Sequence, residues 1–280
     1  MARWRLIGLG LGMVLALSAA AGGETPQDAY ARGKALLAQG EFEGALAAFT
    51  AAARADQSNR EYLDQYSLAR RVVLLRQRLE TEQDPERWAY LARSLHALYC
   101  GEGIFSAAIP LAEQIHARLK DEASAVLLAE TQLAVNRNAE AAAVLGALDK
   151  EKTTAASRAV LGVALARQGD VQAAREILKA VGLGQDAPPQ ARYATARLYA
   201  LTGHSAEAAA ALAACLESVP PSRQAHLREH ARRCPDFAAL ASTAAFAKAL
   251  QTASKVPESA CSGGSGCGSC PMRGNCAKAQ

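Results

Sequence analysis

The feature that most constrains how this chain can fold is a spacing of 34 residues that recurs along it. Two successive copies carry Leu161-Gly162, Gly169-Asp170, Ala174 and Leu178, then Thr195-Ala196, Gly203-His204, Ala208 and Leu212. Each copy begins with a larger residue beside a small one, has a glycine at its middle and a small residue after it. A fixed period of about 20 to 50 residues is the signature of repeat proteins, in which one structural unit stacks on the next.

Further copies extend this pattern in both directions. The alanine after the midpoint recurs at Ala45, Ala108, Ala141, Ala174 and Ala208. These positions place copies at 26–59, 88–120 and 122–153, in addition to the two clear ones. Small residues at fixed places allow two helices to approach closely, so the pattern predicts pairs of packed helices.

The pattern resembles the tetratricopeptide repeat (TPR), over residues 26–59 and 86–222. This resemblance implies an all-α fold, a right-handed superhelical solenoid of antiparallel helix pairs, over residues 26–254 with capping helices at its end. Residues 61–82 depart from the family because they contain no turn residue, and they predict one long helix ending at Asp84-Pro85.

Composition agrees with this interpretation. Alanine, the best helix former, makes up about a quarter of the 280 residues, whereas aromatic residues make up 5%. The 31 basic residues nearly balance the 27 acidic ones. So small an excess excludes the concentrated positive charge of a nucleic-acid-binding protein.

The first 21 residues are typical of a secretory signal peptide. Arg3 and Arg5 precede an apolar stretch from Leu6 to Leu17, and small residues follow at 18–21. The alternative is an uncleaved membrane anchor, but the stretch is short for a span of about 20 residues. We therefore expect an exported protein, periplasmic or secreted, with no membrane span after cleavage.

The TPR resemblance implies that a partner protein or peptide binds in the groove lined by the first helix of each pair. The repeat register gives the candidate groove residues Tyr30, Lys34, Arg93, His96, Glu130, Tyr193 and Arg197. Each of these could equally be a solvated polar residue on a helix face. The lysine–asparagine–arginine clamp by which some family members hold a terminal carboxylate is not reproduced, because Glu130, Val163 and Arg197 occupy the equivalent positions.

One motif could indicate catalysis. His226-Leu227-Arg228-Glu229-His230 has the H-x-x-E-H form of inverzincin metalloproteases, with two histidines on one helix face. Such a site needs a third protein ligand, and the only acids after His230 are Asp236 and Glu258. We therefore expect no enzyme, and place the histidines on the polar side of a capping helix.

The last segment, residues 255–280, is rich in glycine, serine and cysteine. Cys261, Cys267, Cys270 and Cys276 follow a C-x5-C-x2-C-x5-C spacing. The two-residue gap lets two sulfurs turn onto one ion, so the tail is a candidate metal site, with zinc first and an iron–sulfur cluster second. Two disulfides, or a free C-x2-C thiol arm, remain as alternatives. Cys100, Cys215 and Cys234 are expected to pack in or near the core.

The sequence thus favours an exported, non-enzymatic scaffold that binds a protein or peptide through a TPR groove, with a structural or metal-binding tail. The alternative is a metal- or redox-handling protein in which the tail carries the chemistry and the solenoid docks a client.

Overall fold

The fold is all-α. A computed structural model of the chain describes residues 24–149, 151, 153–184 and 186–257. Over these ranges it contains thirteen α-helices, one 3-10 helix and no strand, which confirms the all-α fold of repeated helix pairs. The chain divides into two compact units, residues 1–80 and 81–280, and each is described by itself. The predicted signal peptide and the four tail cysteines lie outside the described residues.

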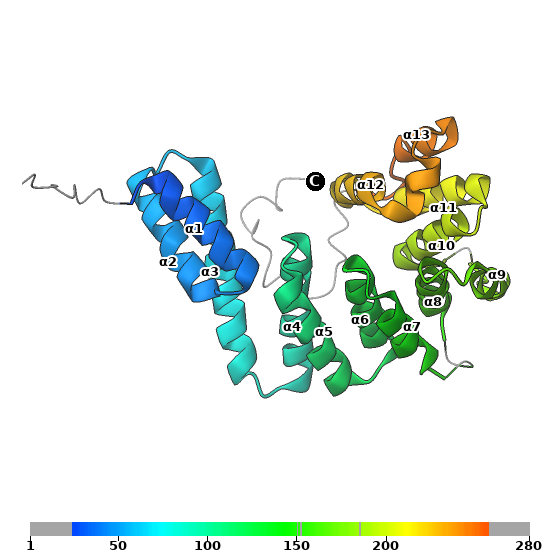
Figure 1. Cartoon of the computed structure of the whole chain (residues 1–280), viewed down its shortest axis with the longest axis horizontal. Coiled ribbons are helices and arrows are strands. Elements are labelled where there is room, and N and C mark those ends of the chain that lie inside the picture. The colour runs from blue at the N-terminus through cyan, green and yellow to red at the C-terminus, as the bar shows by residue number, and fades with distance from the viewer. Residues whose placement is uncertain (1–23, 150, 152, 185, 258–280) are drawn as a thin grey trace, which may run out of the picture. The chain divides into compact units, whose positions relative to one another are not determined.

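The first unit contains one helix pair followed by one long helix (Figure 1): α1 (Pro26–Gln39), α2 (Phe42–Ala55) and α3 (Arg60–Thr81). Thr25 caps α1 by accepting a hydrogen bond from the Asp28 amide. Gly40 ends this helix in the left-handed conformation, with φ of 83°, which glycine adopts without strain. The uninterrupted helix predicted for 61–82 is present as α3.

Helices α1 and α2 meet at Gly33 and Phe49. A Cβ placed on Gly33 would lie 2.6 and 2.7 Å from two atoms of the Phe49 ring, and the ring is fully buried. The glycine is therefore required by the close approach of the two helices. Tyr30 packs beside the same ring and reaches α3, where its hydroxyl donates a 2.5 Å hydrogen bond to Glu61.

The second unit contains four helix pairs in succession. Their helices are α4 (Pro85–Gly101) with α5 (Phe105–Leu119), α6 (Glu122–Ala134) with α7 (Asn138–Gly146), α8 (Ala155–Arg167) with α9 (Val171–Ala180), and α10 (Pro189–Leu201) with α11 (Ser205–Glu217). Within each pair the two helices lie against each other, and the first helices of the last two pairs, α8 and α10, are also in contact. The same arrangement recurs from pair to pair (Figure 1).

Side-chain caps fix where several of these helices begin. Asp84, Asp121 and Thr154 accept hydrogen bonds from the amides three residues further on in α4, α6 and α8. Gly169 and Gly203 lie in the turns of the last two pairs with φ near 90°. The glycines that define the 34-residue period are therefore turn residues with positive φ, which other residues adopt only with strain.

Small residues occupy the contacts between helices, as the period predicted. The repeated alanines Ala108, Ala141, Ala174 and Ala208 are no more than 1% exposed. A Cβ on Gly162 of α8 would lie 2.7 Å from a methyl carbon of Leu198 on α10. Alanine and glycine therefore set the distance between neighbouring helices, and the larger residues fill the remaining space.

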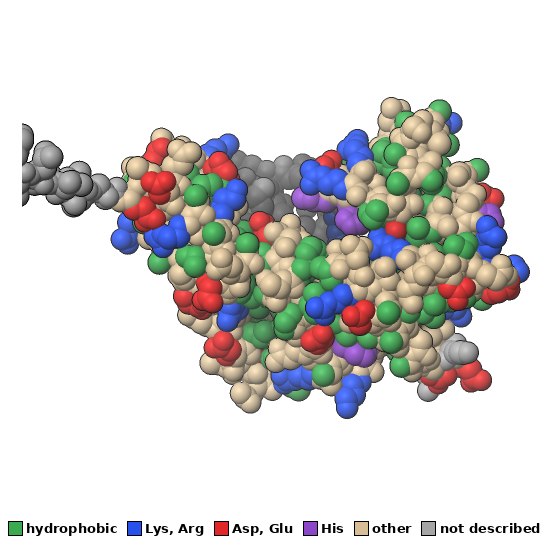
Figure 2. Space-filling view, in the orientation of Figure 1, with side chains coloured by type: hydrophobic (Ala, Val, Ile, Leu, Met, Phe, Trp, Pro, Cys, Tyr) green, Lys and Arg blue, Asp and Glu red, His purple; other side chains and the backbone are tan. Residues whose placement is uncertain are grey.

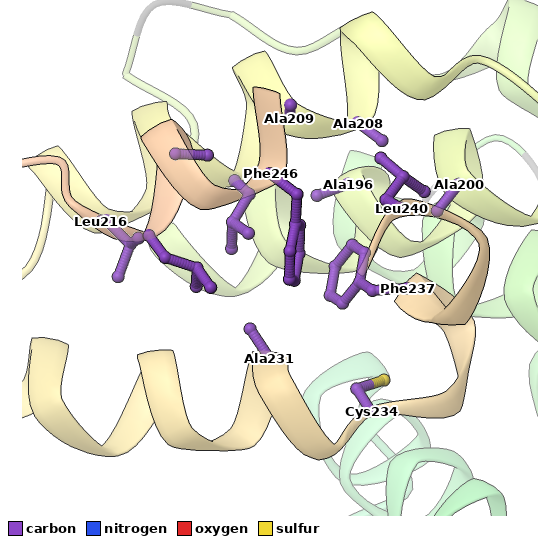
Figure 3. Packing of buried hydrophobic residues seen from close by; sticks show 13 residues of the cluster. Ala196, Ala200, Ala208, Ala209, Leu216, Ala231, Cys234, Phe237, Leu240 and Phe246 are labelled. Carbon is purple, nitrogen blue, oxygen red and sulfur yellow. The ribbon is translucent and has the colours of Figure 1, made fainter. Parts of the chain in front are cut away.

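The last segment of the unit covers the end of the repeats. It consists of α12 (Pro221–Arg233), the 3-10 helix η2 (Pro235–Leu240) and α13 (Ala244–Leu250). The rings of Phe237 and Phe246 pack with their centroids 5.5 Å apart. They lie with Leu240 and Ala231 against small residues of α10 and α11 (Figure 3). This segment, which we call the cap, thus buries the apolar face of the final pair.

None of the helices in the described ranges is both long enough and apolar enough to cross a membrane.

Candidate functional site

A cavity of about 850 Å³ lies within the second unit. The first helices of the four pairs and the cap helix α12 contribute most of its wall. The lining residues are Arg93, Ala123, Val126, Leu127, Glu130, Ala156, Val160, Pro189, Gln190, Tyr193, Arg197, Cys215, Val219, Arg223, His226, Leu227 and His230. A cavity of this size is within the range of ligand-binding sites.

Apolar and basic residues share this lining. Its aliphatic residues come from α6, α8, the start of α10, the segment that precedes α12, and α12 itself. Its charged residues are three arginines and a single acid, Glu130. The cavity can therefore accept apolar groups on its floor and negatively charged groups at its basic side chains.

One face of α12 points into the cavity. Arg223, His226, Leu227 and His230 all line it, and their spacing of three, four and seven residues places them on the same side of a helix. The cap therefore forms part of the binding surface as well as the end of the repeats. The sequence indicated only a capping role for this helix, although the spacing of these four residues is the signal that could have revealed its second role.

A buried network of ion pairs lies beside the cavity. Asp236 of η2 accepts hydrogen bonds from Arg167 at 2.7 and 3.1 Å and from Arg197 at 2.7 Å. Arg197 also donates to both carboxylate oxygens of Glu130, at 2.9 and 2.7 Å. Arg167 makes a further hydrogen bond to the carbonyl of Leu133. These bonds join α6, α8 and α10 to the cap.

The centre of the network is almost completely shielded from water, whereas Glu130 at its edge is 37% exposed. The side chains of Asp236 and Arg197 are 2% and 4% exposed. Burial alone would raise the pKa of Asp236, but the hydrogen bonds from Arg167 and Arg197 and their positive charges more than offset it, so the pKa of this carboxyl lies below its ordinary value. Asp236 is therefore ionised when the protein is folded at neutral pH.

Tyr193 and His230 form a second contact between the repeats and the cap. The Tyr193 hydroxyl lies 2.6 Å from Nδ1 of His230, and the two rings meet edge to face. Burial, followed by the charge of Arg197, lowers the pKa of His230. The imidazole is therefore neutral at neutral pH, and its Nδ1 can accept the hydrogen bond of the tyrosine.

The structure places four of the predicted groove residues around this cavity: Arg93, Glu130, Tyr193 and Arg197. Glu130 and Arg197 bind each other there. Their role in binding a partner stays a prediction. The sequence could not reveal their pairing, because 67 residues separate them.

The other three predicted groove residues do not line the cavity. Tyr30 and Lys34 belong to the first unit, where the Lys34 ammonium lies 5.5 Å from the centroid of the Tyr30 ring. His96 is only 7% exposed, and its Nε2 lies 2.8 Å from the Thr131 hydroxyl, between α4 and α6. The groove position predicted for His96 therefore needs correction, because the side chain satisfies its polar atom inside a helix interface.

A second cavity of about 300 Å³ adjoins the first. The two share Glu130, Arg197 and His230 as lining residues. The smaller cavity is bounded on its other side by Arg167 and Pro235, among others. The ion network therefore separates two hollows on one side of the second unit.

The H-x-x-E-H motif does not gather a metal-binding cluster within the described ranges, where no group of three histidine, cysteine or acidic side chains comes together. Glu229 instead binds Arg233 at 2.6 Å on the outer side of α12. His226 and His230 are both exposed, as expected for the polar side of a capping helix, and that side of α12 lines the cavity.

The described cysteines are three thiols without disulfides, at Cys100, Cys215 and Cys234. Burial raises the pKa of Cys100 and of Cys215 to about 11. Cys215 lines the cavity and donates to the carbonyl of Pro189 at 3.1 Å. Because the thiolate is the reactive form, these thiols act as packing groups.

Comparison with known proteins gives a likeness among solved structures only. No protein-family model matches the chain, and no curated protein matches it. A crystal structure of a thermophilic TPR protein of Thermus thermophilus is similar, with a TM-score of 0.39 and 22% sequence identity over 81% of this chain and 99% of that one.

Proposed function

We propose that this chain is an exported, non-enzymatic scaffold that binds a partner protein or peptide in the cavity of its second unit. The observation that carries the proposal is the cavity itself. It has the size of a ligand site, an apolar floor and a basic side wall formed by α12. A set of stacked helix pairs that exposes such a hollow is suited to holding an extended segment of another protein.

The chemistry of the lining supports binding rather than catalysis. The thiol of Cys215 is protonated at neutral pH because burial raises its pKa. Glu130, the acid in the lining, is bound to Arg197 through both carboxylate oxygens. Among the described residues, no free base and activated nucleophile therefore face each other across the cavity.

Filling the cavity tests this function. Ala156 lies in its wall, so Ala156→Trp would occupy the space that a ligand needs. Ala139→Trp places the same bulk on an exposed position of α7 and is the matched control. We expect peptides selected from a random displayed library to bind the parent protein and Ala139→Trp, and to lose binding to Ala156→Trp. Selected peptides that bind all three proteins equally would overturn the assignment of the cavity.

The cysteine tail adds a separate proposal, supported by its spacing. We infer a structural or metal-binding knuckle formed by Cys261, Cys267, Cys270 and Cys276. Elemental analysis with thiol counting on protein from its native compartment tests it. One equivalent of zinc or an iron–sulfur cluster with protected thiols supports the knuckle, and two disulfides without metal contradict the metal-binding form.

The alternative function, metal or redox handling by the tail, predicts a different result. Replacing Cys267 and Cys270 with serine would abolish the cellular role if the tail carries the chemistry. The scaffold proposal expects the double variant to keep its peptide binding.

Export is proposed from the N-terminal sequence. Cell fractionation followed by N-terminal sequencing of the mature chain tests it. We expect a periplasmic or secreted protein that begins after Ala21, and a cytosolic protein with its first residues intact would contradict export.

A further inference from the structure

We propose that the cavity selects peptide segments in which apolar side chains alternate with carboxylates, and that the cap helix α12 provides the charge recognition. This inference rests on the proposed function and names the class of partner that the same cavity prefers. Its basis is the balance of charge among the lining residues.

Most of the charge near the cavity is already neutralised. Arg167 and Arg197 carry two positive charges, and Asp236 and Glu130 balance them with two negative ones. Arg93 lies 3.5 Å from Asp121, and both side chains are well exposed. An ion pair of that length at the surface contributes little to the stability of the protein, so the Arg93 guanidinium remains available to a ligand.

Arg223 and His226 on α12 are different, because both are exposed and stand ready for a ligand. Within the described part of the chain, neither makes an ion pair or a side-chain hydrogen bond, although both line the cavity. A guanidinium can bind a carboxylate through two parallel hydrogen bonds, and an imidazole N–H can donate one more. Together they form a ready site for an acidic side chain.

The surroundings of this pair are also basic. The single acid of α12, Glu229, is held by Arg233 at 2.6 Å and by Arg232 at 3.6 Å. Basic and histidine side chains gather over the region of α12 in the space-filling view (Figure 2). An incoming carboxylate therefore meets no free acid on this helix.

Apolar contacts lie next to the basic residues. Leu227 stands between His226 and His230 on the same face of α12, and Val126 and Val160 belong to the floor. A peptide with carboxylates alone would leave this floor unfilled, and an apolar peptide would leave Arg223 unpaired. A peptide in which the two side-chain types alternate can fill the apolar floor and also pair with Arg223. Its carboxylates can belong to side chains within the peptide, so a free C-terminal carboxylate is not needed.

The test uses fluorescein-labelled peptides of alternating leucine and aspartate, leucine and asparagine, and leucine and lysine, with blocked ends. Binding to the full chain is followed by fluorescence anisotropy. We expect the aspartate peptide to bind about tenfold more tightly than the asparagine peptide, as two rim charge contacts would give. The lysine peptide should bind most weakly.

Variants of α12 complete the test. The double variant Arg223→Gln with His226→Gln should lose the preference for aspartate and keep the weaker binding of the asparagine peptide. Arg232→Gln is the matched control, because this arginine is on the same helix but lines neither cavity, and it should keep the preference.

The outcomes separate this inference from the proposed function. Equal binding of the aspartate and asparagine peptides, abolished for both by Ala156→Trp, would overturn the charge selection and leave the peptide-binding function standing. A preference for aspartate that survives Arg223→Gln with His226→Gln would also overturn the role of α12. Failure of all three peptides and of every library-selected peptide to bind would contradict both proposals.

Discussion

The carboxylate of Asp236 and the guanidinium of Arg197 are joined by a 2.7 Å hydrogen bond, although both side chains are almost fully buried and 39 residues apart. Arg167 binds the other carboxylate oxygen of Asp236. One residue of the cap thus holds two successive repeats, and through Arg197 it is linked to Glu130 in a third. The position of α12 beside the cavity depends on these contacts.

Asp236→Asn should destabilise the protein by about 3 kcal/mol, because it leaves the buried Arg167 guanidinium without a carboxylate and removes one of the two carboxylates that bind Arg197. Urea unfolding followed by circular dichroism measures the change in the free energy of unfolding. Glu176→Gln removes an exposed partner of Lys179 and should change it by less than about 0.5 kcal/mol. If Asp236→Asn lowered the free energy of unfolding by no more than Glu176→Gln does, the network would not secure the cap.

The same carboxylate predicts an acid-sensitive stability. Because its pKa is lower in the folded chain than in the unfolded one, Asp236 binds protons more readily after unfolding. The stability that Asp236 contributes is fully present above the pKa of the unfolded carboxyl, near 4. It is lost as the pH falls through the pKa of the folded carboxyl. Urea midpoints measured across the acid range should therefore fall less steeply in Asp236→Asn than in the parent protein.

His230 should titrate below its ordinary value of 6.5. The unfolded chain then takes up a proton on this residue before the folded chain does, so its contribution to stability decreases as the pH falls below 6.5. NMR titration of the His230 ring measures the folded pKa directly. Tyr193→Phe removes the hydroxyl that contacts Nδ1 and tests that contact, and an unchanged ring shift in this variant would contradict the hydrogen bond.

Gly33→Ala should destabilise the first unit by about 1 to 3 kcal/mol, because the new methyl group would overlap the buried Phe49 ring. In a Phe49→Leu background, where the ring is absent, Gly33→Ala should cost less stability than it does in the parent protein. A double-mutant cycle therefore isolates the contact. The control is Gly146→Ala, where no atom lies within 4 Å of the added carbon. There the alanine should be neutral or slightly stabilising.

The buried thiols should react slowly. With a pKa of about 11, Cys100 and Cys215 have at least about a hundredfold less thiolate at neutral pH than an unperturbed cysteine. Iodoacetamide labelling of a variant with serine at all four tail cysteines, followed by mass spectrometry, measures their rate. Denaturation in urea should make the same residues react rapidly, and fast labelling of the native protein would contradict their burial.

Much of the fold could be predicted from sequence because its signals are local. Gly169 and Gly203 mark turns, Asp84 and Pro85 mark the start of a helix, and the small residue at Ala174 marks a contact within one pair. Each of these acts over fewer residues than one repeat. The all-α fold of repeated helix pairs followed from such signals, and the structure confirms it.

The candidate site was less predictable, because its contacts join distant segments. The bond from Arg197 to Asp236 depends on how the cap folds back, and no spacing in the sequence encodes that path. The polar side of α12 was predictable, and His226 is exposed there, but the cavity that this side lines depends on where α12 packs. His96 was placed in the groove by register, but it is buried because Thr131 offers it a partner between two helices.

The ion pairs of Asp236 with Arg167 of α8 and Arg197 of α10 also determine when the binding surface is completed during synthesis. A ribosome synthesises the repeats first, and domains generally begin to fold as they emerge. The wall supplied by α12 gains its ion-pair anchor only after residue 236 has followed. A nascent chain that has released all four repeat pairs of the second unit therefore still has an unfinished recognition surface, and the hollow acquires its basic side at the end of synthesis.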